Sequence, residues 1–405
     1  MASHLHAAKK AKDDEFYTQY SDIEKEMNEY YEYDKDVFRN KIVLLPCDDP
    51  EWSNFTKYFV ANFNRLGLKK LISTSYASAT KANKYEAPIE EYHQVTLFEL
   101  NSENYGADKT DSHGKIFTLT RKDDFSKVDI DDLKWDYLEG DGDFRSEEIT
   151  KLRDEADIII TNEPFSLFIE FINWVMEGNK KFSIIANQNV YTDKDAFPLL
   201  EAGKIWVGAH SGDMAFMVPK NSQPRETRYW EDKNGQKWRS MGNATWITNI
   251  EHGVRHERLS LMTQKDNLKY NKKLVKKFNE YGIPPYSQYD NYDAIEVPFV
   301  DAIPSDYKGI MGVPVTFLNK FNPDQFELLG CTQRGCHNLV PDFKKYDEYI
   351  EMKQDGTATK SKGSKTNENA NLAKNDGVHN YFINESNGHI VQSLGSRIFI
   401  RHKEI

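Results

Sequence analysis

Short apolar runs alternate with amphipathic stretches over the first half of the chain. Residues 41–47 form a continuous apolar run typical of a buried strand, and residues 53–66 place aromatic and aliphatic side chains at helical spacing. Gly67 is a typical residue to close that helix, and residues 70–74 predict a second strand. The pattern resumes after residue 145 with a helix at 146–155, a strand at 157–161, a helix at 165–176, a strand at 181–186 and a helix at 193–202. Repeated strand–helix units predict an α/β fold with a largely parallel sheet.

This alternation is interrupted between residues 77 and 135, where two strand-like runs, 94–100 and 115–120, stand in a stretch that we interpret as an insertion. Beyond residue 205 the strand–helix rhythm gives way to short strands and Pro- and Asn-rich connections. We therefore predict a catalytic domain over residues 1–208, and completion of the sheet with a second lobe over 209–405.

Two features of the second lobe can be predicted. Residues 352–377 are rich in Lys, Ser, Thr, Asn, Asp and Gly and almost free of large apolar side chains, which predicts a mobile loop. Residues 397–402, with an apolar centre between polar residues, look like a final strand.

Composition narrows the class of protein. The 405 residues, 39% hydrophobic and 13% aromatic, suffice to bury one large core or a core with a second lobe, so disorder throughout is excluded. No uncharged apolar run reaches the roughly 18 residues of a membrane span, and no signal-peptide pattern follows the first residues, so we expect a cytosolic protein without a membrane partner. Cys47, Cys331 and Cys336 are too few for a disulfide framework or a zinc site, so we expect reduced thiols and no metal.

The formal net charge of −11 argues against a protein that coats nucleic acid through bulk electrostatics, because non-specific DNA affinity comes from Lys and Arg that neutralise phosphates. A local basic cleft is compatible with this charge. Each candidate cluster has an alternative interpretation as an ordinary solvated face. The clusters are Lys69-Lys70, Lys180-Lys181, Arg225 and Arg228 with Lys237 and Arg239, and Lys272-Lys273 with Lys276-Lys277.

Ligands of an open parallel sheet bind beyond the carboxyl ends of its strands, and Asn162-Glu163-Pro164-Phe165 follows one such strand. An aromatic amine is a poor nucleophile because its lone pair is delocalised into the ring. The Asn162 side-chain oxygen and the next backbone carbonyl could accept its two hydrogens and direct the lone pair at a methyl donor. Phe165 could stack on a base that has left the duplex. The structural alternative is that Asn caps a helix and Pro occupies its first turn.

A second polar turn, Cys47-Asp48-Asp49-Pro50, follows the first strand. Its carboxylates could hold the amino group of a methionine-like cofactor, although Asp49 and Pro50 could equally begin the next helix. The turn lacks the G-x-G-x-x-G pattern, which argues against a standard nicotinamide or flavin dinucleotide site.

Two further strings have the composition of a nucleotide pocket. Asp143 could accept from an adenine amino group and Phe144 could cover a purine face, but the glycines around them are also typical of an ordinary turn. Phe16 and Tyr17, followed by Thr18, lie ahead of the first strand and could stack over a nucleotide or simply begin a helix.

Taken together in this order, these strings resemble the EcoRI-type adenine-specific DNA methyltransferase family over about residues 12–330. The matching strings are Asp14-Glu-Phe-Tyr-Thr-Gln19, Cys47-Asp-Asp-Pro50, Gly140-Asp-Gly-Asp-Phe-Arg-Ser-Glu147, Asn162-Glu-Pro-Phe165, Asn291-Tyr-Asp-Ala-Ile-Glu-Val-Pro298 and Gly312-Val-Pro-Val-Thr-Phe-Leu318. The resemblance implies a Rossmann-like S-adenosylmethionine-dependent methyltransferase fold with a C-terminal DNA-recognition lobe. It also implies N6-methylation of a flipped-out adenine in double-stranded DNA, as in restriction-modification or phage DNA protection. No obligate protein partner is evident, and a monomer is sufficient.

Residue by residue, the resemblance implies a catalytic role for the tetrapeptide 162–165 and a cofactor pocket drawn from the other strings. The catalytic residues would be Asn162, Glu163, Pro164 and Phe165, and the pocket for S-adenosyl-L-methionine would include Phe16, Tyr17, Thr18, Cys47, Asp48, Asp49, Pro50, Asp143 and Phe144.

Glu163 departs from the family pattern, which has proline there. Glu keeps the backbone carbonyl that would accept the target amine but lacks the fixed φ of proline, and its carboxylate lies close to the reacting groups. Two alternatives to an active DNA methyltransferase therefore follow. One is a catalytically impaired methyltransferase-like protein that binds DNA or cofactor, and the other is methyl transfer to an RNA base or a protein amide.

Overall fold

The computed structural model describes residues 18–51, 53–77, 112–121, 135–163, 165–218, 226–281, 284–333, 336, 339–346, 348–361, 370–372, 380–393 and 395–403. The chain divides into two compact units. Unit 1 lies within residues 1–188 and 206–253, and unit 2 within residues 189–205 and 254–405. The boundary predicted near residue 208 falls inside a strand of unit 1 that begins at Trp206.

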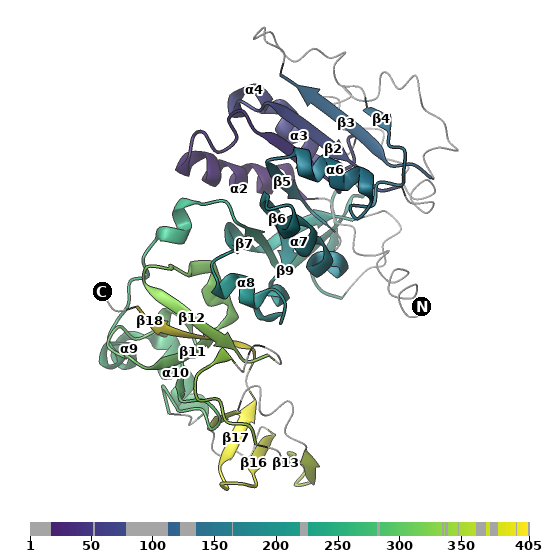
Figure 1. Cartoon of the computed structure of the whole chain (residues 1–405). Coiled ribbons are helices and arrows are strands. Elements are labelled where there is room, and N and C mark those ends of the chain that lie inside the picture. The colour runs from purple at the N-terminus through teal and green to yellow at the C-terminus, as the bar shows by residue number, and fades with distance from the viewer. Residues whose placement is uncertain are drawn as a thin grey trace. The chain divides into compact units, whose positions relative to one another are not determined.

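Unit 1 is built on a nine-stranded mixed sheet of order β4-β3-β2-β1-β5-β6-β9-β7, with β8 paired to β9 (Figure 1). The strands β2, β1, β5 and β6 run parallel to one another, and the remaining pairings are antiparallel. Their bounds are β1 Ile42–Leu45, β2 Lys70–Thr74, β3 Lys115–Thr120, β4 Trp135–Tyr137, β5 Ile158–Thr161, β6 Lys181–Asn187, β7 Trp206–Met217, β8 Tyr229–Glu231 and β9 Lys237–Thr248.

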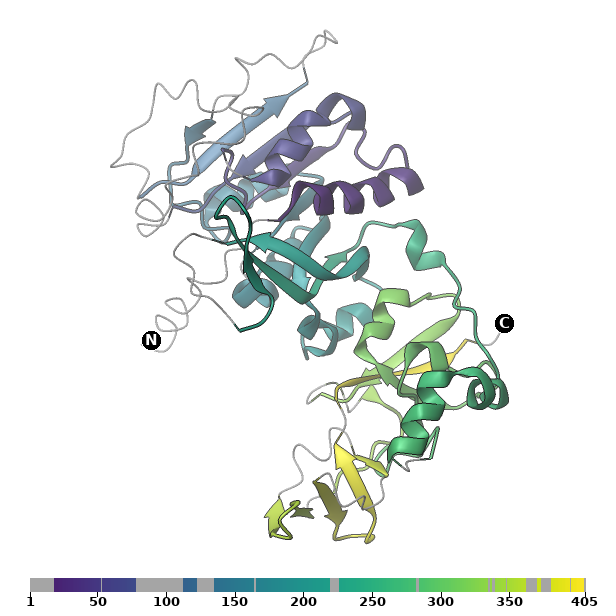
Figure 2. The same ribbon diagram turned by 180° about the vertical axis from the view of Figure 1, so that it is seen from behind.

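Helices cover both faces of the parallel strands (Figures 1 and 2). Val43 and Leu45 of β1 join one core cluster with the helices α2 (Tyr20–Tyr33) and α3 (Asn54–Ala61), whereas Leu44 points to the opposite face. The helices α6 (Glu147–Glu155) and α7 (Phe168–Glu177) lie on that opposite face. All four residues of β1 are buried, which explains why the central strands are continuous apolar runs rather than alternating ones.

The structure confirms the α/β class and the predicted strands at 41–47, 70–74, 115–120, 157–161 and 181–186. The helix predicted at 53–66 is interrupted at Asn62, so α3 is followed by a separate turn, α4 (Phe63–Leu66), which Gly67 ends with a φ of 70°. The helix predicted from Phe165 begins as a 3-10 turn, η3 (Phe165–Leu167), before α7. The predicted strand at 94–100 lies outside the described residues.

Within its described residues, unit 2 contains two smaller sheets and three α-helices. A four-stranded sheet has the order β10-β11-β18-β12, and a five-stranded antiparallel sheet has the order β14-β13-β16-β17-β15. The strands are β10 Ala294–Glu296, β11 Ile310–Pro314, β12 Phe326–Cys331, β13 Tyr349–Met352, β14 Ala358–Ser361, β15 Ala370–Leu372, β16 Tyr381–Asn384, β17 Ile390–Ser393 and β18 Arg397–His402. The helices are α8 Phe197–Glu201, α9 Gln264–Tyr270 and α10 Lys272–Tyr281.

Unit 2 differs from the sequence expectation in two places. The strands β14 and β15 lie inside residues 352–377, for which the sequence predicts a mobile loop. Residues 358–360 are exposed, so this strand carries no apolar face to reveal it in the sequence. The final strand predicted at 397–402 is confirmed as β18.

Candidate active site

The ends of β1 and β5 bring two of the predicted sites together. These strands pair in parallel, with Val43 opposite Ile158, so the residues after each strand lie at the same edge of the sheet. The Thr161 hydroxyl at the end of β5 donates to Asp48 Oδ2 over 2.7 Å. The acidic turn after β1 and the Asn162 turn after β5 therefore lie together at one edge of the sheet.

Asp48 is the central acid of this edge. It is buried, and its second carboxylate oxygen, Oδ1, accepts from the Ser53 hydroxyl over 2.7 Å. Ser53 also accepts from Phe55 N as the N-cap of α3. The Ser73 hydroxyl of β2 donates to the Asp48 backbone carbonyl over 2.6 Å. Hydrogen bonds from Thr161 and Ser53 thus fix the carboxylate of Asp48, and the bond from Ser73 fixes its backbone.

Thr18, just before α2, contacts the Asn162 turn. Asn162 Nδ2 donates to the Thr18 hydroxyl over 3.2 Å, and Asn54 Nδ2 donates to the Thr18 backbone carbonyl over 2.8 Å. With Nδ2 directed at Thr18, Oδ1 is the acceptor atom that the Asn162 carboxamide can offer to an amine. The structure thus brings Thr18, predicted in the cofactor pocket, beside the predicted catalytic amide.

Glu163 is a buried acid within this site. Its side chain is 1% exposed, and neither carboxyl oxygen has a hydrogen-bond partner within the described part of the chain. Burial raises the pKa of this carboxyl to about 8, and the charge of Asp48 adds to the rise. Glu163 is therefore largely protonated at neutral pH unless a positive charge approaches it.

Asp49 faces a cation from strand β3. Lys115 Nζ lies 3.5 Å from Asp49 Oδ2 and forms a closer ion pair with Glu51. The Trp135 indole donates to Glu51 over 3.0 Å, and Lys115 Nζ lies 4.7 Å from the centroid of the Trp135 ring system. The two adjacent aspartates predicted for the cofactor pocket thus have different surroundings.

The predicted adenine-binding string at 140–145 reaches the same edge through residues after β2. Ala77 N donates to the Asp141 carbonyl over 2.6 Å. Gly142 has a φ of 80°, and a Cβ there would overlap the Ser75 carbonyl oxygen, so this close approach requires glycine.

The predicted pair Asp143 and Phe144 have partners of their own. Asp143 binds Arg145 over 2.7 Å; hydrogen bonds and charge from Arg145 lower the pKa of its carboxyl despite partial burial, which acts to raise it. Phe144 is buried edge-on against Phe171 and Trp174 of α7. The polar member of the pair thus lies at the surface and the aromatic member in the core.

The remaining predicted residues are placed as follows. Cys47 is half-buried and Pro50 is buried in the turn after β1. Phe165 is partly buried against the unit 1 core. Phe16, Tyr17 and Pro164 lie outside the described residues.

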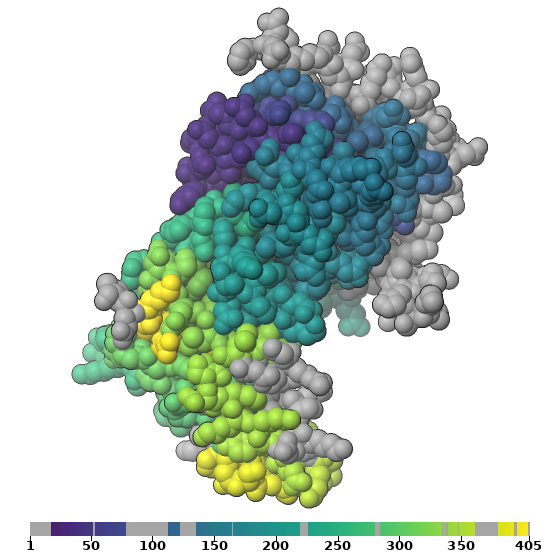
Figure 3. Space-filling view, viewed as in Figure 1, coloured from purple at the N-terminus to yellow at the C-terminus, as the bar shows by residue number. Residues whose placement is uncertain are grey.

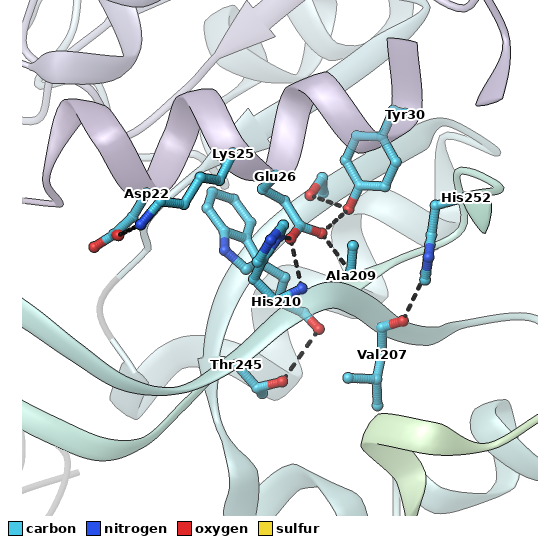
Figure 4. A network of polar contacts seen from close by, with 11 residues as sticks. Asp22, Lys25, Glu26, Tyr30, Val207, Ala209, His210, Thr245 and His252 are labelled. Carbon is cyan, nitrogen blue, oxygen red and sulfur yellow. Dashed lines mark hydrogen bonds and ion pairs between the residues drawn. The ribbon is translucent and has the colours of Figure 1, made fainter. Parts of the chain in front are cut away.

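A buried carboxylate that the sequence did not reveal anchors α2, the helix that follows Thr18. Glu26 accepts from the Tyr30 hydroxyl over 2.6 Å, and from the backbone amides of Ala209 and His210 over 2.9 and 2.8 Å (Figure 4). The ring nitrogen Nδ1 of His210 lies 3.0 Å from Glu26. These amides belong to an irregularity in β7 between Val207 and Ser211, so the acid attaches the helix to the sheet.

The only sequence signal for this anchor is an acid within the apolar stripe of α2, between Ile23 and Tyr30. The hydrogen bond to His210 is the main cause that raises the pKa of the imidazole, which partial burial would lower.

Two classes of feature are absent from the described residues. They contain no group of three or more His, Cys, Asp or Glu side chains able to hold a metal ion. None of the helices in this part of the chain is long and apolar enough to cross a membrane. Cys47, Cys331 and Cys336 are not joined in disulfide bonds.

Comparison with known proteins gives one family. The family model described as adenine-specific methyltransferase EcoRI matches residues 4–403. The chain is 41% identical over 329 residues to the type II methyltransferase M.EcoRI of Escherichia coli, which covers 80% of this chain and 88% of that protein. It is 33% identical to the type II methyltransferase M.MgeORF184P of Mycoplasma genitalium, over 87% of this chain and 92% of that protein. It is 31% identical to the type II methyltransferase M.MpnI of Mycoplasma pneumoniae, over 81% of this chain and 85% of that protein. No solved structure gives a significant match.

Proposed function

Because the chain belongs to the EcoRI family of adenine-specific methyltransferases, we propose that it transfers the methyl group of S-adenosylmethionine to the N6 amino group of an adenine in double-stranded DNA. The observation that carries the proposal is the site at the ends of β1 and β5, where Asn162 lies beside Thr18 and the Thr161 hydroxyl is bonded to Asp48.

Asn162 and the backbone carbonyl of Glu163 hold the target amine in this proposal. Each oxygen accepts one N6 hydrogen, which favours a pyramidal nitrogen with its lone pair directed at the methyl carbon. The two oxygens act by orienting the amine toward the methyl group, so the reaction needs no strong base. In this proposal the adenine leaves the duplex to reach the site, and Phe165, at the start of η3, stacks on it.

The acidic character of the site fits a cationic methyl donor. S-adenosylmethionine supplies an electrophilic methyl group on a positively charged sulfonium and also carries an ammonium group. Asp48 provides a buried carboxyl group, and Glu163 provides one whose oxygens have no partner among the described residues. A nearby positive charge would favour the ionised form of Glu163, because opposite charges lower the pKa of a carboxyl.

The pocket would continue along the edge of the sheet through the other predicted residues. Thr18, Asp49 and the 140–145 string lie on segments joined to this edge by the contacts described above. In this proposal the string at 140–145 binds the adenine of the cofactor, and Asp143 is its polar end.

Glu163 does not remove the minimal geometry of the reaction, since its backbone carbonyl replaces that of proline. The alternative of a catalytically impaired protein has no support from the relatives, which are named as methyltransferases. We further propose that unit 1 is a Rossmann-like methyltransferase fold, that unit 2 is the DNA-recognition lobe, and that the chain acts as a monomer in restriction-modification or DNA protection.

The test is methyl transfer from labelled S-adenosylmethionine to duplex DNA that lacks methylation, with the digested nucleosides separated by mass. We expect label in N6-methyladenine with the full chain and none with Asn162→Ala, the matched control. RNA and a protein extract as parallel acceptors test the remaining alternative. Absence of labelled N6-methyladenine from every DNA offered would refute the proposal. If label is found, sequencing of the methylated positions identifies the target site.

A further inference from the structure

The helices α9 and α10 of unit 2 carry an unusual charge. Residues 264–281 contain six lysines against two acids, a net charge of +4 within a chain whose net charge is −11. The two helices follow each other directly and lie side by side (Figures 1 and 2). We define the lysine surface as the exposed Lys265, Lys269, Lys272, Lys273 and Lys276.

The lysines gather on one side of each helix. Lys265 and Lys269 are four residues apart on α9, as are Lys272 and Lys276 on α10, and residues at this spacing lie on the same helical face. Leu274, by contrast, is buried. Like charges at this spacing destabilise a helix by a few tenths of a kcal/mol, so folding alone gives no reason for the cluster.

The two helices keep a positive net charge after their own two acids are counted. Asp266 accepts from the Thr263 hydroxyl over 2.7 Å, within the N-terminal cap of α9. Asp301 Oδ2 lies 3.1 Å from Lys273 Nζ, which makes Lys273 a member of the surface with an acidic partner.

Apolar side chains are exposed among these charges. Leu268, Tyr270 and Phe278 are three of the seven large hydrophobic side chains found exposed in the described residues. Tyr270 is 58% exposed, and Lys269 Nζ lies 4.8 Å from the centroid of its ring. Lysines clustered along a helix are the electrostatic footprint of a surface that binds nucleic acid.

We propose that the lysine surface binds the phosphate backbone of duplex DNA and holds unit 2 on its substrate. The lysine surface and DNA are complementary in charge, because DNA carries one negative charge per about 1.7 Å of helix axis and binding releases its condensed counterions. The inference rests on the proposed function, which supplies duplex DNA as the substrate. Phosphate contacts of this kind give affinity and orientation but no sequence preference.

The experiment measures binding of the full chain to a fluorescent duplex between 50 and 300 mM salt, by anisotropy. Each lost phosphate contact should lower the slope of log K against log salt by about 0.9. The double variant Lys269→Gln/Lys272→Gln should therefore bind more weakly at low salt, with a slope smaller by about 1.8. Lys151→Gln on α6, 73% exposed and paired with Glu147, is the control and should leave the slope unchanged.

A gain of binding provides a test that misfolding cannot mimic. Asp301→Asn removes the acid beside Lys273, so it should strengthen DNA binding and steepen the slope. The proposal is overturned if the double variant has the affinity and slope of the wild type, if Lys151→Gln weakens binding equally, or if only RNA binding is lost. Methyl transfer by the wild type is measured separately, so failure of the proposed function and failure of this surface remain distinguishable.

Discussion

The side chain of Asn162 donates through Nδ2 to the hydroxyl of Thr18 over 3.2 Å, across 144 positions of sequence. In this contact the amide nitrogen is the donor and the hydroxyl oxygen is the acceptor. An amide turned by 180° would direct its nitrogen at the target amine, where an acceptor is needed. Thr18 is thus a positioning residue for Asn162.

The first prediction concerns this orientation. Thr18→Val keeps the shape of the side chain but removes its acceptor, so kcat should fall by about fivefold, the worth of one hydrogen bond of about 1 kcal/mol. Thr18→Ser keeps the hydroxyl and should remain near the wild type. Steady-state methyl transfer checks both, and the KM for S-adenosylmethionine should change less than kcat.

A double variant distinguishes orientation from a general structural effect. Asn162→Asp has two equivalent oxygens and needs no orientation, so adding Thr18→Val to it should cost much less than in the wild type. An equal cost in both backgrounds would mean that Thr18 does not act through the Asn162 amide.

The second prediction follows from the raised pKa of Glu163. A carboxyl that titrates at about 8 in the folded chain and near 4.5 when unfolded binds its proton more tightly in the folded state. Between these values the free energy of unfolding must fall as pH rises, by about 1.4 kcal/mol per pH unit from this group. Glu163→Gln should lack this contribution, so its stability relative to the wild type should increase steadily from pH 5 to 8. Urea denaturation of both proteins across this pH range measures the difference in their free energies of unfolding. If the two pH profiles run parallel, the pKa of Glu163 is not raised in the folded chain.

The third prediction concerns His210, whose pKa is raised chiefly by its hydrogen bond to Glu26. A raised pKa means that the folded state favours the protonated ring, so the stabilisation is complete below the unfolded pKa of about 6.5 and is lost as pH rises through the folded value. His210→Asn offers a donor near the position of Nδ1 without titrating, and it should remove this loss. Thermal unfolding of the two proteins is measured at pH 6 and at pH 8. If the difference in stability between wild type and His210→Asn is the same at both pH values, the prediction is wrong.

The fourth prediction concerns Gly142, where both φ and the Ser75 carbonyl exclude a side chain. Gly142→Ala should lower the free energy of unfolding by more than 1 kcal/mol. Gly203→Ala is a matched control, because Gly203 has a φ of 63° but no atom within 4 Å of an added Cβ. It should cost about 1 kcal/mol from φ alone. Equal losses in chemical denaturation would show that the Ser75 contact is unimportant.

The parallel strands of unit 1, and the meeting of Asp48 and Asn162 at one edge of them, could be predicted from sequence because both depend on local pattern. Continuous apolar runs predicted β1 and β5, and parallel pairing then placed Asp48 and Asn162 at one edge. The contact of Thr18 with Asn162 and that of Glu26 with β7 depend instead on how distant segments pack. For Glu26, the sequence signal was an acid at a position within the apolar stripe of α2.

Element ends were predicted less well, for reasons that the structure supplies. The helix expected from Asp193 begins only at Phe197, because Asp193 Oδ1 accepts from the amides of Asp195 and Ala196 in a turn, and Pro198 then occupies the first helical turn. The exposed strand β14 gave no hydrophobic signal, since both of its faces are polar.

The lysine surface also has a kinetic consequence. A chain with a net charge of −11 is repelled by DNA in most orientations, whereas a compact region of +4 is attracted. The molecule therefore has a charge asymmetry that orients it during diffusion, before any short-range contact forms. Its association rate with DNA should increase as ionic strength falls, although the two partners have net charges of the same sign.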